Sequence, residues 1–184
     1  MGRRIEPRLT YEHLRQMPDD GRRYELLEGR IVISPAPKWR HQRIVTKLLA
    51  FLVRGETAGF GVTVTAPTDV VFDPEDSAAE PDLLFIASER MGIITEDNVQ
   101  GAPDLLVEVL SPSTAHRDFG VKMRIYARFG VRWYWIADPD EDTLHVFELR
   151  DGAYVETAIL REGDTLACPL FPGVTAPVGD IFAQ

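Results

Sequence analysis

The sequence has 184 residues, of which 45% are hydrophobic and 27% charged, so it can form one compact core and predicts a single domain over residues 1–184. Its 29 Asp and Glu residues exceed its 20 Lys and Arg residues, and the formal net charge of -9 argues against a protein that coats nucleic acid through a uniformly positive surface. The single cysteine, Cys168, excludes an intramolecular disulfide and favours a reducing compartment.

The sequence has no segment suited to a membrane. Its longest apolar stretch, Leu48–Val53, is far too short to span a bilayer, and the basic N-terminus is not followed by an apolar run of signal-peptide length. We therefore expect a cytoplasmic protein that makes no membrane contact.

The first third of the chain predicts two helices and a hairpin. Thr10 is a suitable N-cap for a helix over residues 11–17, and extended runs on either side of Glu28-Gly29 predict a hairpin over residues 24–33. A longer amphipathic helix is expected from Lys38 to Arg54, where apolar residues recur at helical spacing: Ile44, Val45, Leu48, Leu49 and Leu52.

The middle of the chain predicts strands. Short runs at 62–64 and 69–72 precede an acidic loop at 73–76. The runs at 81–86 and 104–110 are nearly apolar throughout, which is typical of interior strands covered on both faces.

The last third returns to a helix and then to strands. Ser111–Thr114 can cap a helix over 115–129, which Gly130 ends. A strand over 131–137, a hairpin over 143–149 and 154–159, and an irregular Pro-rich tail are expected to follow. This order predicts an α/β fold with a mixed β-sheet flanked by helices, and we expect the aromatic residues Trp133, Tyr134 and Trp135 in its core.

Two acids are placed badly for a hydrophobic core. Glu108 lies inside an apolar strand and Asp82 begins another, so each needs a cation or a proton. If the strands are neighbours, the two carboxylates can converge and hold Mg²⁺ or Mn²⁺. The alternatives are a turn role for Asp82 and a buried salt bridge for Glu108.

Lys122 is a candidate third member of this site. It lies one helical turn from Asp118 and one from Tyr126, so the three share a helix face. A lysine can neutralise charge that develops on a phosphate. The alternative is a solvated Asp118–Lys122 pair of the kind common on helix surfaces.

The hairpin carries two further acids, Glu25 and Glu28. Because side chains alternate along a strand, these two lie on opposite faces and only one can face a given site.

Several short motifs appear in a fixed order through nearly the whole chain. They are RYELLEG (23–29), Ser34-Pro35 with His41, EPDLL (80–84), GAPDLLVEVLSPST (101–114), Lys122 with Tyr126-Ala127, Gly130-Val131, Tyr134-Trp135 and Asp138-Pro139. This ordered set resembles the Uma-type restriction endonuclease family, a bacterial group within the PD-(D/E)XK nuclease superfamily.

The resemblance implies a restriction-endonuclease-like fold and a catalytic site of Glu25, Asp82, Glu108 and Lys122. Two residues after Glu108 the superfamily lysine is replaced by Leu110, so its role would pass to Lys122. The implied reaction is hydrolysis of DNA phosphodiester bonds, with Asp82, Glu108 and the Val109 carbonyl holding Mg²⁺ or Mn²⁺. Lys122 would position the attacking water or stabilise the transition state, and Glu25 would bind a second ion or its water.

Positive charge is concentrated in two segments of the chain, which makes DNA a possible partner despite the negative net charge. The segments 38–54 and 115–132 contain half of the 20 basic residues and only one acid, Asp118. Trp39 and His41 in the first segment could stack on or bond to a nucleic acid, although each basic side chain is individually typical of a solvated helix face. A homodimer would suit cleavage of both strands.

Two other functions remain open at this level. The acidic net charge and Leu110 also fit a non-catalytic binding or assembly module that keeps a nuclease fold. A glycosidase could use the same carboxylate pair, but it would not explain Lys122.

Overall fold

The computed structural model describes residues 8–183. Its helices are α1 (Tyr11–Arg15), α2 (Trp39–Thr57), α3 (Ala115–Arg117), α4 (Met123–Phe129) and α5 (Val178–Phe182), with a 3-10 segment η1 (Ser88–Ile93) and a π-helical turn η2 (Asp118–Lys122). Its strands are β1 (Arg23–Leu27), β2 (Arg30–Ser34), β3 (Gly61–Thr65), β4 (Val70–Asp73), β5 (Ser77–Ala79), β6 (Leu83–Ala87), β7 (Val99–Gln100), β8 (Leu105–Val109), β9 (Trp133–Asp138), β10 (Thr143–Arg150), β11 (Ala153–Leu160), β12 (Thr165–Ala167) and β13 (Thr175–Pro177).

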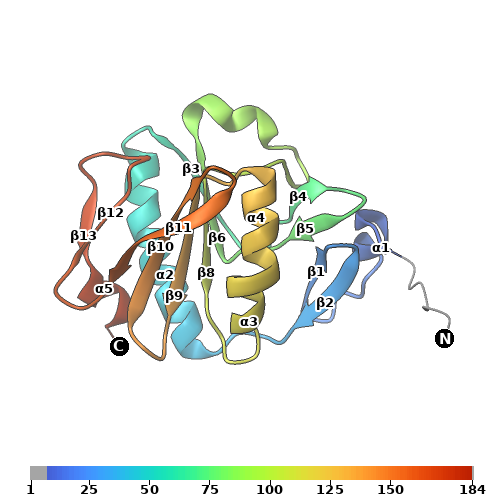
Figure 1. Ribbon diagram of the computed structural model, residues 1–184, viewed down its shortest axis with the longest axis horizontal. Coiled ribbons are helices and arrows are strands. Elements are labelled where there is room, and N and C mark those ends of the chain that lie inside the picture. The colour runs from blue at the N-terminus through green and yellow to red at the C-terminus, as the bar shows by residue number, and fades with distance from the viewer. Residues whose placement is uncertain (1–7, 184) are drawn as a thin grey trace.

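The central sheet has six strands in the order β11-β10-β9-β8-β6-β3 (Figure 1). It is mixed, because β8 and β9 are parallel whereas the other neighbours are antiparallel. A five-stranded sheet, β2-β1-β5-β4-β7, lies to its side, and β12 pairs with β13. The predicted α/β fold with a mixed sheet and flanking helices is confirmed, as is the N-terminal helix and hairpin.

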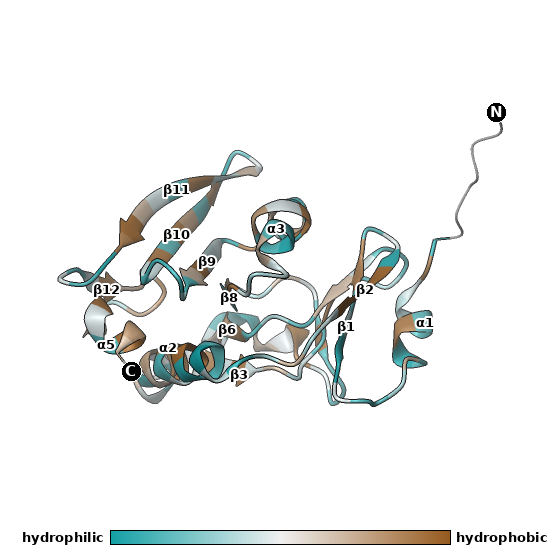
Figure 2. Cartoon of the chain, turned by 90° about the horizontal axis from the view of Figure 1, so that it is seen from below, coloured by the Kyte–Doolittle hydropathy of each residue, from teal (hydrophilic) through white to brown (hydrophobic). Residues whose placement is uncertain are grey.

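Helices cover both faces of the central sheet (Figure 2). Leu105 and Val107 pack in one cluster with Ile44 of α2, whereas Leu106 packs in another with Ile125 of α4. Since side chains alternate along β8, the even-numbered positions face the α3–α4 side. This alternation turns Glu108 toward the helices that carry Asp118, Lys122 and Tyr126.

The helix expected over 115–129 is interrupted. Residues 118–122 form a π-helical turn between α3 and α4, and Gly130 then ends the helix with φ 85°. One extra residue in a helical turn has no signature in hydrophobic spacing, and such turns occur frequently at functional sites.

The irregular tail and part of the strand prediction need correction. The tail contains β12, β13 and α5, whose Leu166, Val178 and Ile181 join the core cluster that includes α2. The strands β5 and β7 were not predicted, because two- and three-residue strands are too short to show a period, and the 3-10 segment η1 was not predicted either. In contrast, Trp133, Tyr134 and Trp135 are all buried, as expected.

Within residues 8–183, no helix combines the length and the apolar character needed to cross a membrane.

Candidate active site

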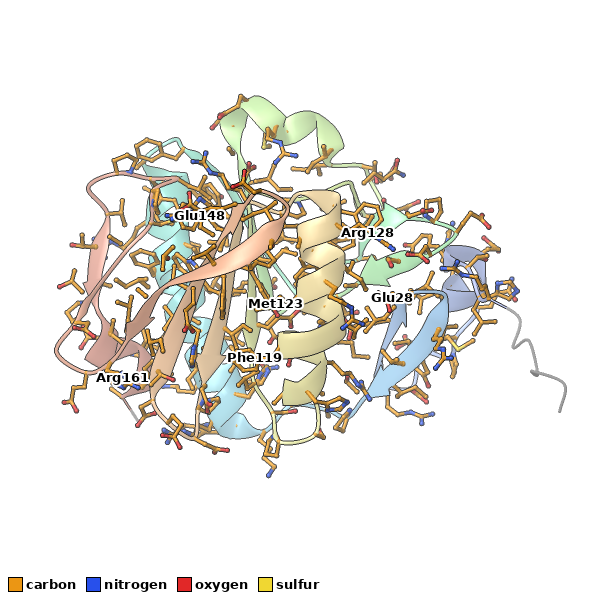
Figure 3. All side chains as sticks on the ribbon, viewed as in Figure 1. Glu28, Phe119, Met123, Arg128, Glu148 and Arg161 are labelled. Carbon is orange, nitrogen blue, oxygen red and sulfur yellow. The ribbon has the colours of Figure 1, made fainter. Side chains whose placement is uncertain are left out.

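The N-terminal hairpin buries one of its two acids, Glu25, and leaves the other, Glu28, exposed. Strands β1 and β2 are joined by a tight turn in which Glu28 and Gly29 both have positive φ, 52° and 76°. Glu25 is 1% exposed, and its Oε1 accepts a 3.0 Å hydrogen bond from the Glu80 amide. Glu28 lies on the outside of the hairpin (Figure 3), where Arg124 contacts it at 3.3 Å. The expectation that only one of the two faces a site is confirmed.

Asp82 and Glu108 come together because β6 and β8 are antiparallel neighbours. Leu83 pairs with Val107, so the same register places Asp82 opposite Glu108. The Val109 amide donates a 2.8 Å hydrogen bond to Oδ2 of Asp82. Both carboxylates are buried, with 3% and 2% of their residue surfaces exposed.

Lys122 reaches both Glu25 and Glu108 from the π-helical turn. Its Nζ lies 2.8 Å from Oε1 of Glu25 and 2.9 Å from Oε1 of Glu108, and Asp118 is 3.7 Å away. The Tyr126 hydroxyl donates a 2.7 Å hydrogen bond to the same oxygen of Glu108. Lys122 and Asp118 are both buried, so the reading of a solvated helix-surface pair is wrong.

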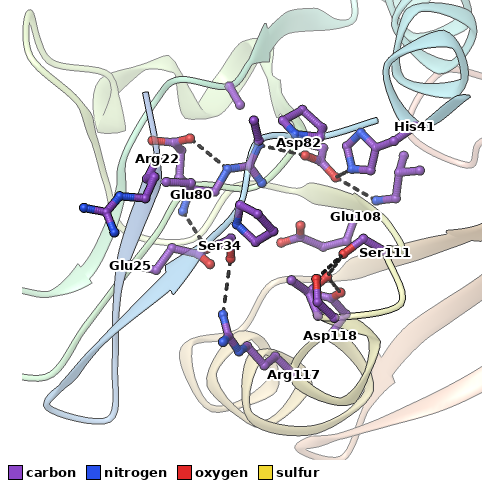
Figure 4. A pocket seen from close by; sticks show the side chains of 18 of the residues that line it. Arg22, Glu25, Ser34, His41, Glu80, Asp82, Glu108, Ser111, Arg117 and Asp118 are labelled. Carbon is purple, nitrogen blue, oxygen red and sulfur yellow. Dashed lines mark hydrogen bonds and ion pairs between the residues drawn. The ribbon is translucent and has the colours of Figure 1, made fainter. Parts of the chain in front are cut away.

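Asp82 has two side-chain partners that sequence reasoning did not assign to it. Arg23 donates to Oδ1 at 2.9 Å and also pairs with Glu80, and His41 Nε2 lies 3.2 Å from Oδ2. Figure 4 shows the His41 ring turned toward Asp82. Both partners belong to motifs that carried the family resemblance, but nothing in their local spacing indicates a contact with residue 82.

The buried charges shift one another's pKa values. Burial raises the pKa of Glu108 to about 8 despite the attraction of Lys122, and the nearby carboxylates of Asp118, Asp82 and Glu25 add to the rise. Burial opposes the charge of Lys122, yet Glu108, Glu25 and Asp118 together raise its pKa well above the ordinary lysine value. Lys122 is therefore a permanent cation.

The Asp82 carboxyl behaves in the opposite way to Glu108. Burial would raise its pKa, but the hydrogen bond from His41, the charge of Arg23 and the Val109 amide hold it well below its usual range. Asp82 is thus the carboxylate of the opposed pair that stays ionised at neutral pH.

These side chains line a cleft of about 650 Å³ between the hairpin, the start of α2 and the loop that follows β8 (Figure 4). Arg117 crosses from α3 to the hairpin side of this cleft, where it donates to the Ile33 carbonyl at 3.1 Å and to Ser34 Oγ at 3.2 Å. The cleft is lined by both acidic and basic groups, and its buried floor is rich in carboxylates.

The floor suits a hard divalent cation that binds together with substrate. The single ammonium of Lys122 lies within 4 Å of three carboxylates, those of Glu25, Glu108 and Asp118. Arg23 forms ion pairs with both Glu80 and Asp82. Lys122 and Tyr126 both bond to Oε1 of Glu108, so neither occupies Oε2. Within the described part of the chain, no three His, Cys, Asp or Glu side chains form a ready-made metal cage. Mg²⁺ needs only one or two carboxylates when water and phosphate oxygens complete its shell, so Oε2 of Glu108 is available to it, and Asp82 would bind it through an oxygen that also accepts from Arg23 or from His41 and the Val109 amide.

The two basic segments do not form an unopposed positive surface. Arg40 pairs with Asp142, Arg124 with Glu28, and Arg128 with Asp76. Acids from distant parts of the chain therefore offset much of the local excess of positive charge, and Lys38 and Arg117 are the members of these segments that line the cleft together with Lys122.

Comparisons with protein families and with solved structures both give matches that cover most of the chain. A family model described as "Uma2: Putative restriction endonuclease" matches residues 11–179. A search of curated protein sequences finds no match. Among solved structures, a protein from Anabaena variabilis ATCC 29413, described as a "putative nuclease belonging to DUF820", superposes with a TM-score of 0.78 at 19% identity, over 95% of this chain and 98% of that one. At this identity the likeness shows a shared fold.

Proposed function

Because this chain belongs to the Uma2 family of restriction-endonuclease-like proteins, we propose that it is a metal-dependent endonuclease that hydrolyses phosphodiester bonds in DNA. The observation that carries the proposal is the placement of Asp82 opposite Glu108 across two paired strands, with the buried ammonium of Lys122 2.9 Å from Glu108. Two acids that can hold a metal ion and a lysine that can stabilise phosphate charge are sufficient groups for metal-dependent phosphodiester hydrolysis.

Asp82 and Glu108 are the proposed ligands of Mg²⁺ or Mn²⁺. The Val109 carbonyl, which follows Glu108 in β8, would be a further oxygen ligand. When bound, the ion would neutralise phosphate charge and make water a better nucleophile at neutral pH. Glu108 must lose its proton to serve as a ligand, and its raised pKa makes this step dependent on pH.

Lys122 is proposed to stabilise negative charge on the phosphate as the bond to it breaks. Its raised pKa excludes a role as general base, because the amine stays protonated. Glu25 binds Lys122 and is itself held by the Glu80 amide, so we assign Glu25 to positioning the lysine rather than to a second ion. This role suits a carboxylate whose Oε1 already accepts from both groups.

Three residues on the Asp82 side are proposed to position that carboxylate. His41, Arg23 and the Val109 amide approach its two oxygens from different elements and limit its rotation. A carboxylate with a fixed orientation loses less entropy when it binds a cation.

The test is a cleavage assay of the purified full chain with duplex DNA, single-stranded DNA and RNA, in Mg²⁺, Mn²⁺ or EDTA. We expect DNA cleavage that EDTA abolishes and that Asp82→Asn and Glu108→Gln each reduce by about 100-fold or more.

The hairpin supplies a matched pair of controls. Glu25→Gln should reduce cleavage, whereas Glu28→Gln, which changes an exposed acid three residues away, should not. A chain that binds DNA equally well with and without these acids, and cuts none of the substrates, would instead be a non-catalytic module with a nuclease fold.

A further inference from the structure

A second, smaller cavity opens beside the catalytic cleft. It has a volume of about 170 Å³ and lies between the start of α2, the loop after β8 and the loop after β9. It shares Lys38, His41, Ser111 and Pro112 with the large cleft, so the two spaces meet at His41. Because His41 contacts Asp82, the small cavity begins one side chain away from a proposed metal ligand.

We propose that this cavity receives one unpaired pyrimidine base from the DNA strand that is being cut. The inference rests on the proposed nuclease function and gives it a substrate class: a strand with at least one unstacked nucleotide next to the scissile phosphate. Enzymes that act on a base outside the helical stack hold that base in a small pocket beside the reacting group, and a strand with an unstacked base next to the scissile phosphate could use this cavity in the same way.

The walls of the cavity suit the faces of an aromatic ring. They are formed by Leu110, Pro112, Ala115 and Pro139. Leu110 is 7% exposed and is anchored in the core cluster on the α4 side of the sheet, so this part of the wall is rigid. Apolar walls of this kind favour burial of the faces of an uncharged ring over the binding of a charged group.

The size of the cavity favours a single ring. An apolar cavity of roughly 150 Å³ in another protein holds one benzene molecule. A cavity of about 170 Å³ therefore has room for one six-membered pyrimidine ring.

The rim carries the polar groups that a nucleotide needs. Asp140 places an exposed carboxylate at one side, where it can accept a hydrogen bond from the amino or imino edge of a base. Asp138 lies beside it, and its Oδ1 accepts from the amides of Asp140 and Glu141. Lys38 is exposed at the junction with the cleft, where the phosphate of the same nucleotide would lie. Arg40 donates to the Pro139 carbonyl at 3.0 Å and forms an ion pair with Asp142. These two contacts connect α2 to the loop after β9, which forms one wall of the cavity.

The test measures binding separately from cleavage. Fluorescence anisotropy of the full chain in EDTA and low salt would compare labelled single strands of equal length: oligo-dT, oligo-dC, oligo-dA and an abasic strand. We expect the pyrimidine strands to bind about tenfold more tightly than the abasic strand, since burying one ring against apolar walls has an effect of this order. Oligo-dA should fall close to the abasic strand.

Two variants connect the preference to the cavity. Ala115→Phe fills the cavity and should remove the preference while leaving affinity for the abasic strand unchanged. Asp140→Ala, at an exposed position, should lower the ratio of oligo-dT affinity to abasic-strand affinity about threefold by removing one edge acceptor, whereas the loss of its charge acts on both strands alike. Glu141→Ala is the matched control, because its side chain is also exposed and is not part of the cavity wall.

If Ala115→Phe unfolds, which thermal melting would show, the Asp140 and Glu141 pair decides the question alone. Equal binding of oligo-dT and the abasic strand, equal binding of oligo-dT and oligo-dA, or an oligo-dT to abasic ratio that Asp140→Ala leaves unchanged would overturn the base pocket. If such a chain still cuts DNA with Mg²⁺, the proposed function survives without the pocket. A chain that keeps the pyrimidine preference but cuts no DNA supports the pocket and contradicts the nuclease.

Discussion

Lys122 Nζ lies 2.9 Å from Oε1 of Glu108, and both side chains are almost completely buried. The same ammonium lies 2.8 Å from Glu25, so one cation from a π-helical turn joins a strand of the central sheet to the N-terminal hairpin. Breaking such a buried pair leaves an uncompensated charge in a low-dielectric site. The stability of the domain and the chemistry of the cleft therefore depend on the same side chains.

The first prediction concerns the loss of this cation. At pH 9, where Glu108 is ionised, Lys122→Met should lower the free energy of unfolding by about 3–5 kcal/mol, because the buried carboxylates of Glu25 and Glu108 then lose the ammonium that both contact. Urea denaturation would measure the change, with Lys47→Met on the partly exposed face of α2 as a control expected to shift stability by about 0.5 kcal/mol or less. Adding Glu108→Gln to Lys122→Met should recover part of the loss. Strict additivity of the two substitutions would contradict the coupling.

The second prediction is a pH dependence of stability in metal-free buffer. Glu108 has an ordinary pKa of 4.5, which burial in the fold raises to about 8. Between these values the folded chain binds more protons at this group than the unfolded chain, so its contribution to stability falls as pH rises. Melting curves at pH 5, 6.5 and 8 should show a smaller decline in Glu108→Gln than in the wild type. Parallel declines in the two proteins would show that Glu108 does not titrate in this range.

The third prediction separates stability from activity with two tyrosines. Tyr126→Phe removes a buried hydroxyl that donates to Glu108 at 2.7 Å, and Tyr154→Phe removes one that donates to the Val131 carbonyl, also at 2.7 Å. Each should cost about 1–3 kcal/mol of stability. Only Tyr126→Phe should also reduce DNA cleavage, by about 10- to 100-fold, because the carboxylate of Glu108, a proposed metal ligand, then loses a hydrogen bond that fixes its orientation. Equal cleavage by the two variants would argue against Glu108 as that ligand.

The fourth prediction concerns the rim of the cleft. Arg117 is bonded to the Ile33 carbonyl and Ser34 and lines the cleft. Arg117→Gln should change stability by about 1 kcal/mol or less but reduce the slope of log Kd against log salt for DNA by about 1, because one phosphate contact is lost. Arg150→Gln is the control, since Arg150 pairs with Glu148 on the hairpin at the opposite edge of the sheet. An unchanged salt slope for Arg117→Gln would remove this residue from the DNA surface.

Much of the secondary structure can be predicted because its signals are local. Helical spacing of Ile44, Leu48 and Leu52 marks α2, and the continuous apolar runs mark β6 and β8. In contrast, β3 and β4 are near neighbours in sequence and belong to different sheets. A local hydrophobic pattern shows which side chains need burial, but it does not show which sheet will bury them.

By itself, the sequence determined that Glu108 must find a partner inside the core, and that Glu25 and Glu28 must face opposite ways. Both conclusions follow from burial and from the two-residue period of a strand. Only the tertiary structure decided that β6 runs antiparallel to β8 in a register that sets Asp82 opposite Glu108. It also brought Arg23 and His41 to Asp82. Register and pairing between distant segments depend on the packing of the whole core, because no local period specifies a distant partner.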